Sequence, residues 1–184
     1  KQGTWREIQD KLVVPKNQLI ELTKGSLTLG NLIVEPFAVS HDAADPIGIN
    51  VFSGKDKATV VTDTGIISDD ILHRIDDSTL LVLEANYDPH MLRFGPYQPF
   101  LKQRVASDEG HLSNEMAAQA LLMMKRPDFM QVILAHRSEN NNNAVLVTQT
   151  IGKMLVDGGV RIGPEMKLQH GQPNEIVSMQ SIKR

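Results

Sequence analysis

Residues 57–65, KATVVTDTG, decide the fold, because they combine a buried strand with a carboxylate at its end. The run Ala58–Thr62 is apolar and β-branched, and Gly54 and Gly65 lie on either side of it, which is typical of a buried strand. Asp63 follows at the point where open α/β sheets place ligands and catalytic groups. Because an unpaired buried carboxylate is costly, we predict a functional role for Asp63. The alternative is a turn or helix cap, which Asp-Thr-Gly also suits.

Three other predicted strands also lead into a side chain that can bind a metal ion. Imidazole and carboxylate groups together suit zinc, manganese or iron. A single histidine at a strand end is more often a hydrogen-bonded structural residue than a ligand. The strands and the groups that end or follow them are Asn31–Ser40 with His41, Thr79–Leu83 with Glu84, and Phe129–Ala135 with His136. Their agreement in position favours one common site.

The order of the predicted elements indicates an α/β sandwich with a mixed sheet. Residues 85–95 are predicted to be irregular, and His170, beside Gly171, is predicted to be a surface histidine. One domain spanning residues 1–184 is the simplest organisation. Besides the four strands above, we predict strands at Leu19–Leu22, Ser26–Leu29, Ile47–Phe52 and Met166–Gln169, and helices at Thr4–Leu12, Pro99–Ala106, Ala144–Val156 and directly after Ser68 and Ser113.

Composition and charge exclude several classes of protein. The 184 residues are 41% hydrophobic and 22% charged, which is ordinary for a globular chain. The absence of cysteine excludes disulfides and thiolate metal sites, so any metal ion must be held by His, Asp or Glu. The net charge of −3 gives no overall reason to expect nucleic acid. No segment approaches the roughly 20 apolar residues of a membrane span, so we expect a cytoplasmic protein without a membrane partner. The oligomeric state is left open.

Four motifs, in this order along the chain, carry a family resemblance. They are VSHDAADP at residues 39–46, TDTG at 62–65, GHLSNE at 110–115 and HRSENN at 136–141. Together they resemble the metallo-β-lactamase superfamily, and within it the YycJ/WalJ branch of bacterial metal-dependent hydrolases. The similarity covers roughly residues 27–157. It implies a metallo-β-lactamase-type αββα sandwich.

The resemblance implies a centre with two divalent metal ions, zinc or manganese. His41 resembles the histidine that binds the first ion, and His136 resembles the histidine that binds the second. Asp63 resembles the carboxylate that bridges the two ions, and is expected to be catalytic through them.

His111 resembles the non-ligand histidine that phosphodiesterase members place against the scissile phosphate or leaving group, so we expect it to be catalytic. Its loop leads into the N-terminus of a helix, where an anion is favoured. Ser113 and Asn114, which follow it, are therefore expected to bind substrate. The alternative for His111 is a structural cap beneath that helix.

One departure from the family pattern is large. The signature His-x-His-x-Asp-His, which supplies most of the metal ligands in the superfamily, is absent, and no His-x-His pair occurs anywhere in this sequence. In the family the signature lies upstream of the region that matches residues 1–30. We therefore expect this chain to be the C-terminal part of the fold, without its N-terminal segment.

The predicted function is a metal-dependent hydrolase that acts on a phosphodiester, as a DNA exonuclease whose attacking hydroxide is shared by two metal ions. This function requires that the missing N-terminal segment, or a separate chain, completes the site. Arg93, Lys102 and Arg104 are candidates for phosphate contacts, or else part of a solvated face. Two alternatives stay open. The same fold could act on a small ester, lactam or phosphodiester, or the chain could be a non-catalytic remnant that binds a partner, because the signature is missing.

Overall fold

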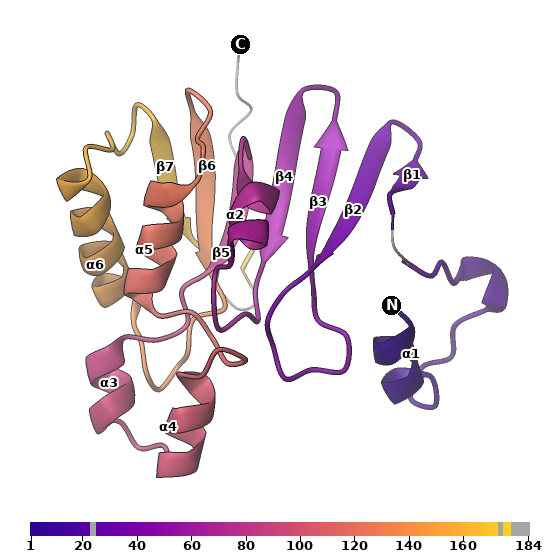
Figure 1. Ribbon diagram of the computed structural model, residues 1–184, viewed down its shortest axis with the longest axis horizontal. Helices are drawn as coiled ribbons and strands as arrows, with labels where there is room; N and C mark the ends of the chain where they lie inside the picture. Colours follow the sequence, from indigo (N-terminus) through magenta and orange to yellow (C-terminus); the bar gives the residue numbers. More distant parts are fainter. Residues whose placement is uncertain (23–24, 173–174, 178–184) are drawn as a thin grey trace.

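The computed structural model describes residues 1–22, 25–172 and 175–177, and their strands form one mixed sheet in the order β1 to β7 (Figure 1). Antiparallel pairs join β1 to β4, and β4 to β7 are parallel. This confirms the α/β class with a mixed sheet. The strands are β1 (Leu27–Leu29), β2 (Leu32–Ala38), β3 (Ile47–Ser53), β4 (Asp56–Val61), β5 (Leu80–Glu84), β6 (Met130–Ala135) and β7 (Met166–His170).

The helices pack mainly on one face of this sheet. Figure 1 shows α2, α5 and α6 side by side over that face, while α3 and α4 lie beyond the ends of the strands. The main core forms between the sheet and the helices α2, α5 and α6, and Leu83, Leu121 and Ile151 are among its fully buried members. The helices are α1 (Gln2–Ile8), the 3-10 helix η1 (Lys16–Gln18), α2 (Asp69–Ile75), α3 (Pro89–Phe94), α4 (Pro99–Val105), α5 (Asn114–Met123) and α6 (Ala144–Asp157). Among the described residues, no helix is long and apolar enough to cross a membrane.

The opposite face of the sheet is also apolar. Ile49, Val60 and Val82 are paired across adjacent strands, and their side chains share that face. Val60 is 40% exposed, and Ile49 and Val82 are partly buried. The described residues therefore supply one sheet and one helical layer, which is half of an αββα sandwich.

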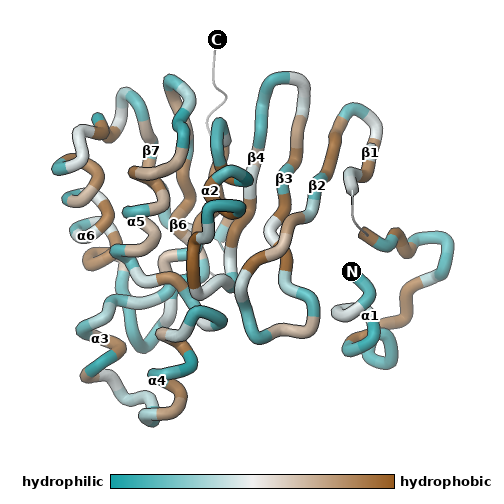
Figure 2. Tube along the Cα trace, viewed as in Figure 1, coloured by the Kyte–Doolittle hydropathy of each residue, from teal (hydrophilic) through white to brown (hydrophobic). Residues whose placement is uncertain are grey.

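Turn and cap residues explain why the elements begin and end where they do. Gly54 takes a positive φ of 58° in the tight hairpin between β3 and β4, a conformation that costs glycine little. Ser68 and Ser113 accept hydrogen bonds from the backbone N–H groups of Ile71 and Met116, so both cap the helices that they were predicted to begin. Figure 2 shows that the β3–β4 turn is hydrophilic, whereas brown, hydrophobic segments lie along the strands.

Some sequence predictions were wrong. Residues 85–95 contain the helix α3, because the Asp88 side chain caps its first turn and Pro89 suits the first helical position. The predicted strand at Leu19–Leu22 is absent, since this segment finds no strand partner among the described residues. His170 is partly buried at the end of β7, where its Nε2 lies 2.9 Å from Thr148 Oγ1. The turn expected around Lys24 falls outside the described residues.

Two loops that border the strand ends touch each other without room for a side chain. A Cβ atom added at Gly65 would lie 2.3 Å from the carbonyl oxygen of Ser107, and one added at Gly110 would lie 2.2 Å from the carbonyl oxygen of Arg104. Backbone atoms cannot shift as a flexible side chain can. Gly65 therefore lets the loop after β4 pack against the loop between α4 and α5, and Gly110 lets that second loop pack against the end of α4.

We expect Gly65→Ala to lower the free energy of unfolding by about 1–3 kcal/mol, because the added methyl group overpacks two backbone segments. Chemical denaturation followed by circular dichroism measures this change. Gly152→Ala in α6 is the matched control: its nearest neighbour would be Ile162 at 3.9 Å, and a helical Gly-to-Ala change is neutral or stabilising by up to about 1 kcal/mol. Equal stabilities of the two variants would contradict this packing.

Candidate metal site

The predicted site residues meet at one edge of the sheet. β4, β5 and β6 are parallel, and two antiparallel pairings make β2 run in the same direction. Their carboxyl ends therefore share an edge, and His41, Asp63 and His136 follow β2, β4 and β6 there. His111 reaches the same place from the loop between α4 and α5.

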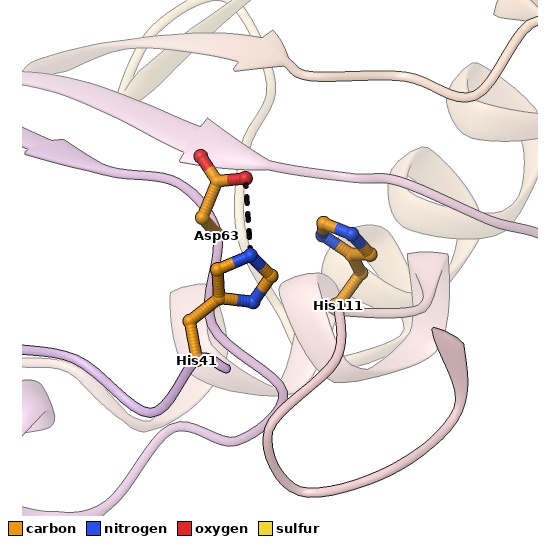
Figure 3. Close-up of side chains that lie close together, drawn as sticks. All are labelled: His41, Asp63 and His111. Carbon is orange, nitrogen blue, oxygen red and sulfur yellow. Dashed lines mark ion pairs between the residues drawn. The ribbon is translucent and has the colours of Figure 1, made fainter. Parts of the chain in front are cut away.

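Asp63 lies between two imidazole rings. Its Oδ1 is 3.8 Å from Nε2 of His41 and 3.6 Å from Nε2 of His136. His111 stands between the same two histidines, with ring centroids 5.1 Å from His41 and 5.2 Å from His136. Figure 3 shows His41 and Asp63 joined by their ion pair, with the His111 ring facing them.

Glu84, the last residue of β5, is a buried carboxylate behind the site. Its Oε1 lies 2.7 Å from Nδ1 of His111 and 2.7 Å from Nδ1 of His136. Its Oε2 accepts hydrogen bonds from the backbone N–H groups of Thr64 and Leu112, at 3.2 and 3.4 Å. Four donors from three loops thus converge on one fully buried side chain.

These contacts fix which nitrogen each histidine presents. A carboxylate only accepts hydrogen bonds, so Nδ1 of His111 and of His136 must each carry a proton and donate it to Glu84. Nδ1 of His41 likewise donates to the carbonyl oxygens of Glu109 and Gly110, at 3.0 and 3.1 Å. All three rings therefore keep Nε2 free for a metal ion or a substrate.

The charges of this cluster are coupled. Burial alone would raise the pKa of the Glu84 carboxyl, but the hydrogen bonds from His111 and His136 hold that pKa below its usual value. The hydrogen bond to Glu84 raises the pKa of His136, against the opposing effect of burial. Glu84 thus remains a carboxylate despite its burial, and it increases the basicity of the His136 imidazole.

The backbone is strained at two of the site residues. Asp63 has a φ of 57° and His136 a φ of 51°, and Asp77 is the only other non-glycine residue with a positive φ in the described part of the chain. Such conformations cost roughly 1–3 kcal/mol each and persist where the surroundings impose them. At both positions the strained residue turns its side chain into the site as the strand ends.

The ion pair between Asp42 and Arg104 fixes the loop that contains His41. Both oxygens of Asp42 accept hydrogen bonds from the guanidinium of Arg104 in α4, one of them at 2.9 Å. This pairing holds the pKa of the Asp42 carboxyl below its usual value. Arg104, a candidate phosphate contact in the sequence, is thus engaged in holding α4 against the site.

Ser113 and Asn114 are not open to a ligand in this structure. Ser113 is 4% exposed and its hydroxyl caps α5, while the fully buried Asn114 exchanges side-chain hydrogen bonds with Asn142. Both therefore have a structural role, and substrate binding by them stays a prediction.

The donor set fits a divalent metal ion. His41, Asp63 and His111 bring three donor atoms within 4.8 Å of one another. Glu84, His111 and His136 also lie this close, but there the Glu84 carboxylate already accepts the Nδ1 protons of both rings. Two donors bound about 2.1 Å from one ion in tetrahedral geometry lie about 3.4 Å apart, so the 3.6 and 3.8 Å separations around Asp63 need little adjustment. Imidazole and carboxylate donors suit zinc or manganese.

The mixed sheet, its helical layer and the imidazole and carboxylate groups at the carboxyl ends of the strands define the class: an α/β protein with a candidate metal site. The sequence profile of the beta-lactamase superfamily domain matches residues 2–136. Exodeoxyribonuclease YycJ of Bacillus anthracis is 32% identical over 97% of this chain and 69% of its own length. Exodeoxyribonuclease WalJ of Streptococcus pneumoniae is 30% identical over 97% of this chain and 68% of its own length. The chain belongs to the metallo-β-lactamase superfamily and is YycJ/WalJ-like.

Solved structures agree on the fold. The metallo-β-lactamase fold protein YhfI from Bacillus subtilis superposes with a TM-score of 0.61 at 13% identity, over 89% of this chain and 57% of its own. Zn²⁺-bound PqqB from Methylobacterium extorquens gives 0.54 at 16% identity, over 82% and 49%. The chain thus spans about half the length of these two structures. Together with the names of the sequence relatives, the superfamily supports a metal-dependent hydrolase.

Sequence reasoning grouped Glu84 with the other strand-end residues of a common site but did not predict that it orients the histidines. The available signal was a carboxylate directly after the apolar run Thr79–Leu83, the same pattern that singled out Asp63. Its two histidine partners are 27 and 52 residues away, so only the tertiary structure reveals what it orients.

We expect Glu84→Gln to lower the free energy of unfolding by about 1–3 kcal/mol, because one amide oxygen cannot satisfy four buried donors. Denaturation curves of the metal-free protein measure the change. Glu139→Gln, the same substitution at an exposed position, should leave the free energy within about 0.5 kcal/mol of the wild type. Equal stability of the two variants would show that the Glu84 contacts contribute nothing.

Proposed function

We propose that this protein is a metal-dependent phosphodiesterase that degrades DNA as an exonuclease, with its centre at His41, Asp63, His111 and His136. The observation that carries the proposal is the position of Asp63 Oδ1, less than 4 Å from Nε2 of both His41 and His136. A carboxylate oxygen between two free imidazole nitrogens suits a bridge between two cations. The choice of DNA is supported by the printed names of the two relatives.

In this proposal His41 and His136 each hold one divalent ion through Nε2, and Asp63 holds both. When bound, divalent ions would supply Lewis acidity and would make hydroxide available as a nucleophile near neutral pH. The protein contributes geometry: Glu84 and the carbonyl oxygens of Glu109 and Gly110 fix the ring orientations. Rings held in this way need little rearrangement to bind metal ions.

His111 is proposed as the proton donor. Glu84 holds its Nδ1 proton and orients the ring, so Nε2 faces the reacting groups. An imidazole with an oriented Nε2 can carry a proton at that atom and give it to the departing oxygen. The ring is only 18% exposed at its side chain, so the bulk solvent competes little for this proton.

We expect Asp63→Ala to abolish hydrolysis and also the increase in melting temperature that zinc or manganese causes in the wild type. Metal ions that bind only the native state raise Tm. Removal of the ligand Asp63 should lower the metal affinity by more than the roughly 100-fold loss that follows removal of an outer-shell partner. Elemental analysis, thermal shift and cleavage of an end-labelled oligonucleotide measure it. Asp76→Ala, at the C-cap of α2, is a control acidic substitution away from the site. Retained turnover in Asp63→Ala would refute the assignment, and a wild type that binds no metal would favour a non-catalytic remnant.

Salt distinguishes DNA from a small substrate. Each phosphate contacted on single-stranded DNA contributes about −0.7 to the slope of log K against log salt concentration. We expect the binding of an oligonucleotide to weaken steeply between 50 and 200 mM salt, on the order of tenfold or more for several contacts. Hydrolysis of a neutral small ester should hardly change. A flat salt dependence for the oligonucleotide would point to a small substrate on the same fold.

A further inference from the structure

The helices α3 and α4 form a unit of their own beside the site. Figure 1 shows them beyond the carboxyl ends of β4 to β7, apart from the layer formed by α2, α5 and α6. Their small core contains Tyr87, Leu92 and Val105, with Tyr97 and Leu101 against it, and is separate from the main core. A compact unit with its own core can present a surface without disturbing the sheet.

Two phenylalanines of this unit are excluded from that core. Phe94, at the end of α3, is 67% exposed, and Phe100, in the first turn of α4, is 72% exposed. They are the only aromatic residues among the large apolar side chains that are exposed in the described part of the chain. The other three phenylalanines, Phe37, Phe52 and Phe129, are buried or partly buried.

The charge of the unit is opposite to that of the whole chain. Residues 89–106 contain Arg93, Lys102 and Arg104 but no acidic residue, whereas the chain has a net charge of −3. Arg104 is engaged with Asp42. The Arg93 guanidinium lies 5.3 Å from the centroid of the Phe94 ring, and Lys102 donates to the Arg93 carbonyl oxygen. Neither Arg93 nor Lys102 has a carboxylate partner among the described residues.

The unit is held against both sides of the site. On one side Arg104 binds Asp42, the residue after the proposed ligand His41. On the other side the backbone N–H of Asp88, the N-cap of α3, donates to the carbonyl oxygen of Asn141 at 2.8 Å, in the loop that follows His136. A DNA strand that leaves the proposed metal centre beside Asn141 would therefore meet the α3–α4 unit.

We propose that Phe94 and Phe100, with Arg93 and Lys102, form a binding surface for single-stranded DNA that extends the site. The proposal rests on the proposed function. Bases stack on the phenylalanine rings and backbone phosphates meet the two cations, the combination that sequence-independent single-strand binding uses. Duplex DNA hides the faces of its bases, so the surface selects an unpaired strand.

The test is the affinity of the metal-free protein for a fluorescent oligothymidine, measured by anisotropy. Phe94→Ala and Phe100→Ala should each raise the Kd roughly 5- to 150-fold, the range found for losing one base–aromatic stack. Phe→Trp at either position keeps a flat π-face and should retain the affinity. Phe→Leu keeps apolar area but has no π-face, so it should behave like alanine. Met123→Ala, which removes an exposed apolar side chain of α5, is the control.

The cations are tested by salt dependence. Arg93→Gln and Lys102→Gln should each reduce the slope of log K against log salt concentration by about 0.7, the loss of one phosphate contact on a single strand. Lys153→Gln in α6, which removes a cation paired with Asp157, should leave the slope unchanged. Melting curves of all variants verify folding.

The outcomes separate the two proposals. If the leucine variants bind DNA as tightly as the wild type, stacking is refuted. If the alanine variants bind equally well but change the molar mass in light scattering, the surface joins copies of this chain and the proposal is overturned. If the wild type hydrolyses DNA while all Phe variants keep its affinity, the function stands and this surface fails. If neither the wild type nor any variant hydrolyses DNA but the affinities change as expected, the DNA-binding surface is supported and the proposed exonuclease function is refuted.

Discussion

The buried carboxylate of Glu84 is the constraint on which the site depends. Removing a carboxylate from water costs several kcal/mol unless hydrogen bonds replace its hydration. Here the replacement comes from His111, His136 and the backbone N–H groups of Thr64 and Leu112. These donors lie on the loops after β4 and β6 and before α5, so one side chain ties three loops to the end of β5. If any loop moves, a buried charge loses a partner.

Strain and close packing follow from the same convergence. Asp63 and His136 adopt positive φ angles that L-residues disfavour, and each turns a side chain toward the centre. Gly65 permits the backbone approach between the loop of Asp63 and the loop that carries His111, and Gly110 permits the close packing of that second loop on the end of α4. The sheet core, with members such as Leu83 and Leu134 almost fully buried, supplies the rigidity that holds these costly conformations.

In the proposed function, the metal centre and the α3–α4 unit have different tasks and different physical properties. The centre is rigid, and its imidazoles are oriented by buried acceptors. The α3–α4 unit has a separate small core and is attached through the Arg104–Asp42 pair and the backbone beside Asn141. Its exposed rings, with Arg93 and Lys102, which have no carboxylate partner among the described residues, suit a flexible polymer that needs contact area and charge rather than one exact geometry.

The sequence by itself predicted the seven strands that the described residues form, together with one at Leu19–Leu22 that is absent from them. A common site for His41, Asp63 and His136 was predicted as well, because parallel strands place their carboxyl ends at one edge. It also predicted the caps of α2 and α5 from local chemistry. Only the tertiary structure decided the role of Glu84, the burial of Ser113 and Asn114, and the pairing of Arg104 with Asp42. The role of Glu84 and the pairing of Arg104 depend on contacts between segments distant in the chain: 27 and 52 residues for Glu84, and 62 for Arg104. Helix α3 instead begins with a local signal, Asp88 followed by Pro89, that the sequence analysis did not use. Periodicity and local propensity carry no information about such contacts, whereas strand direction does constrain where strand ends meet.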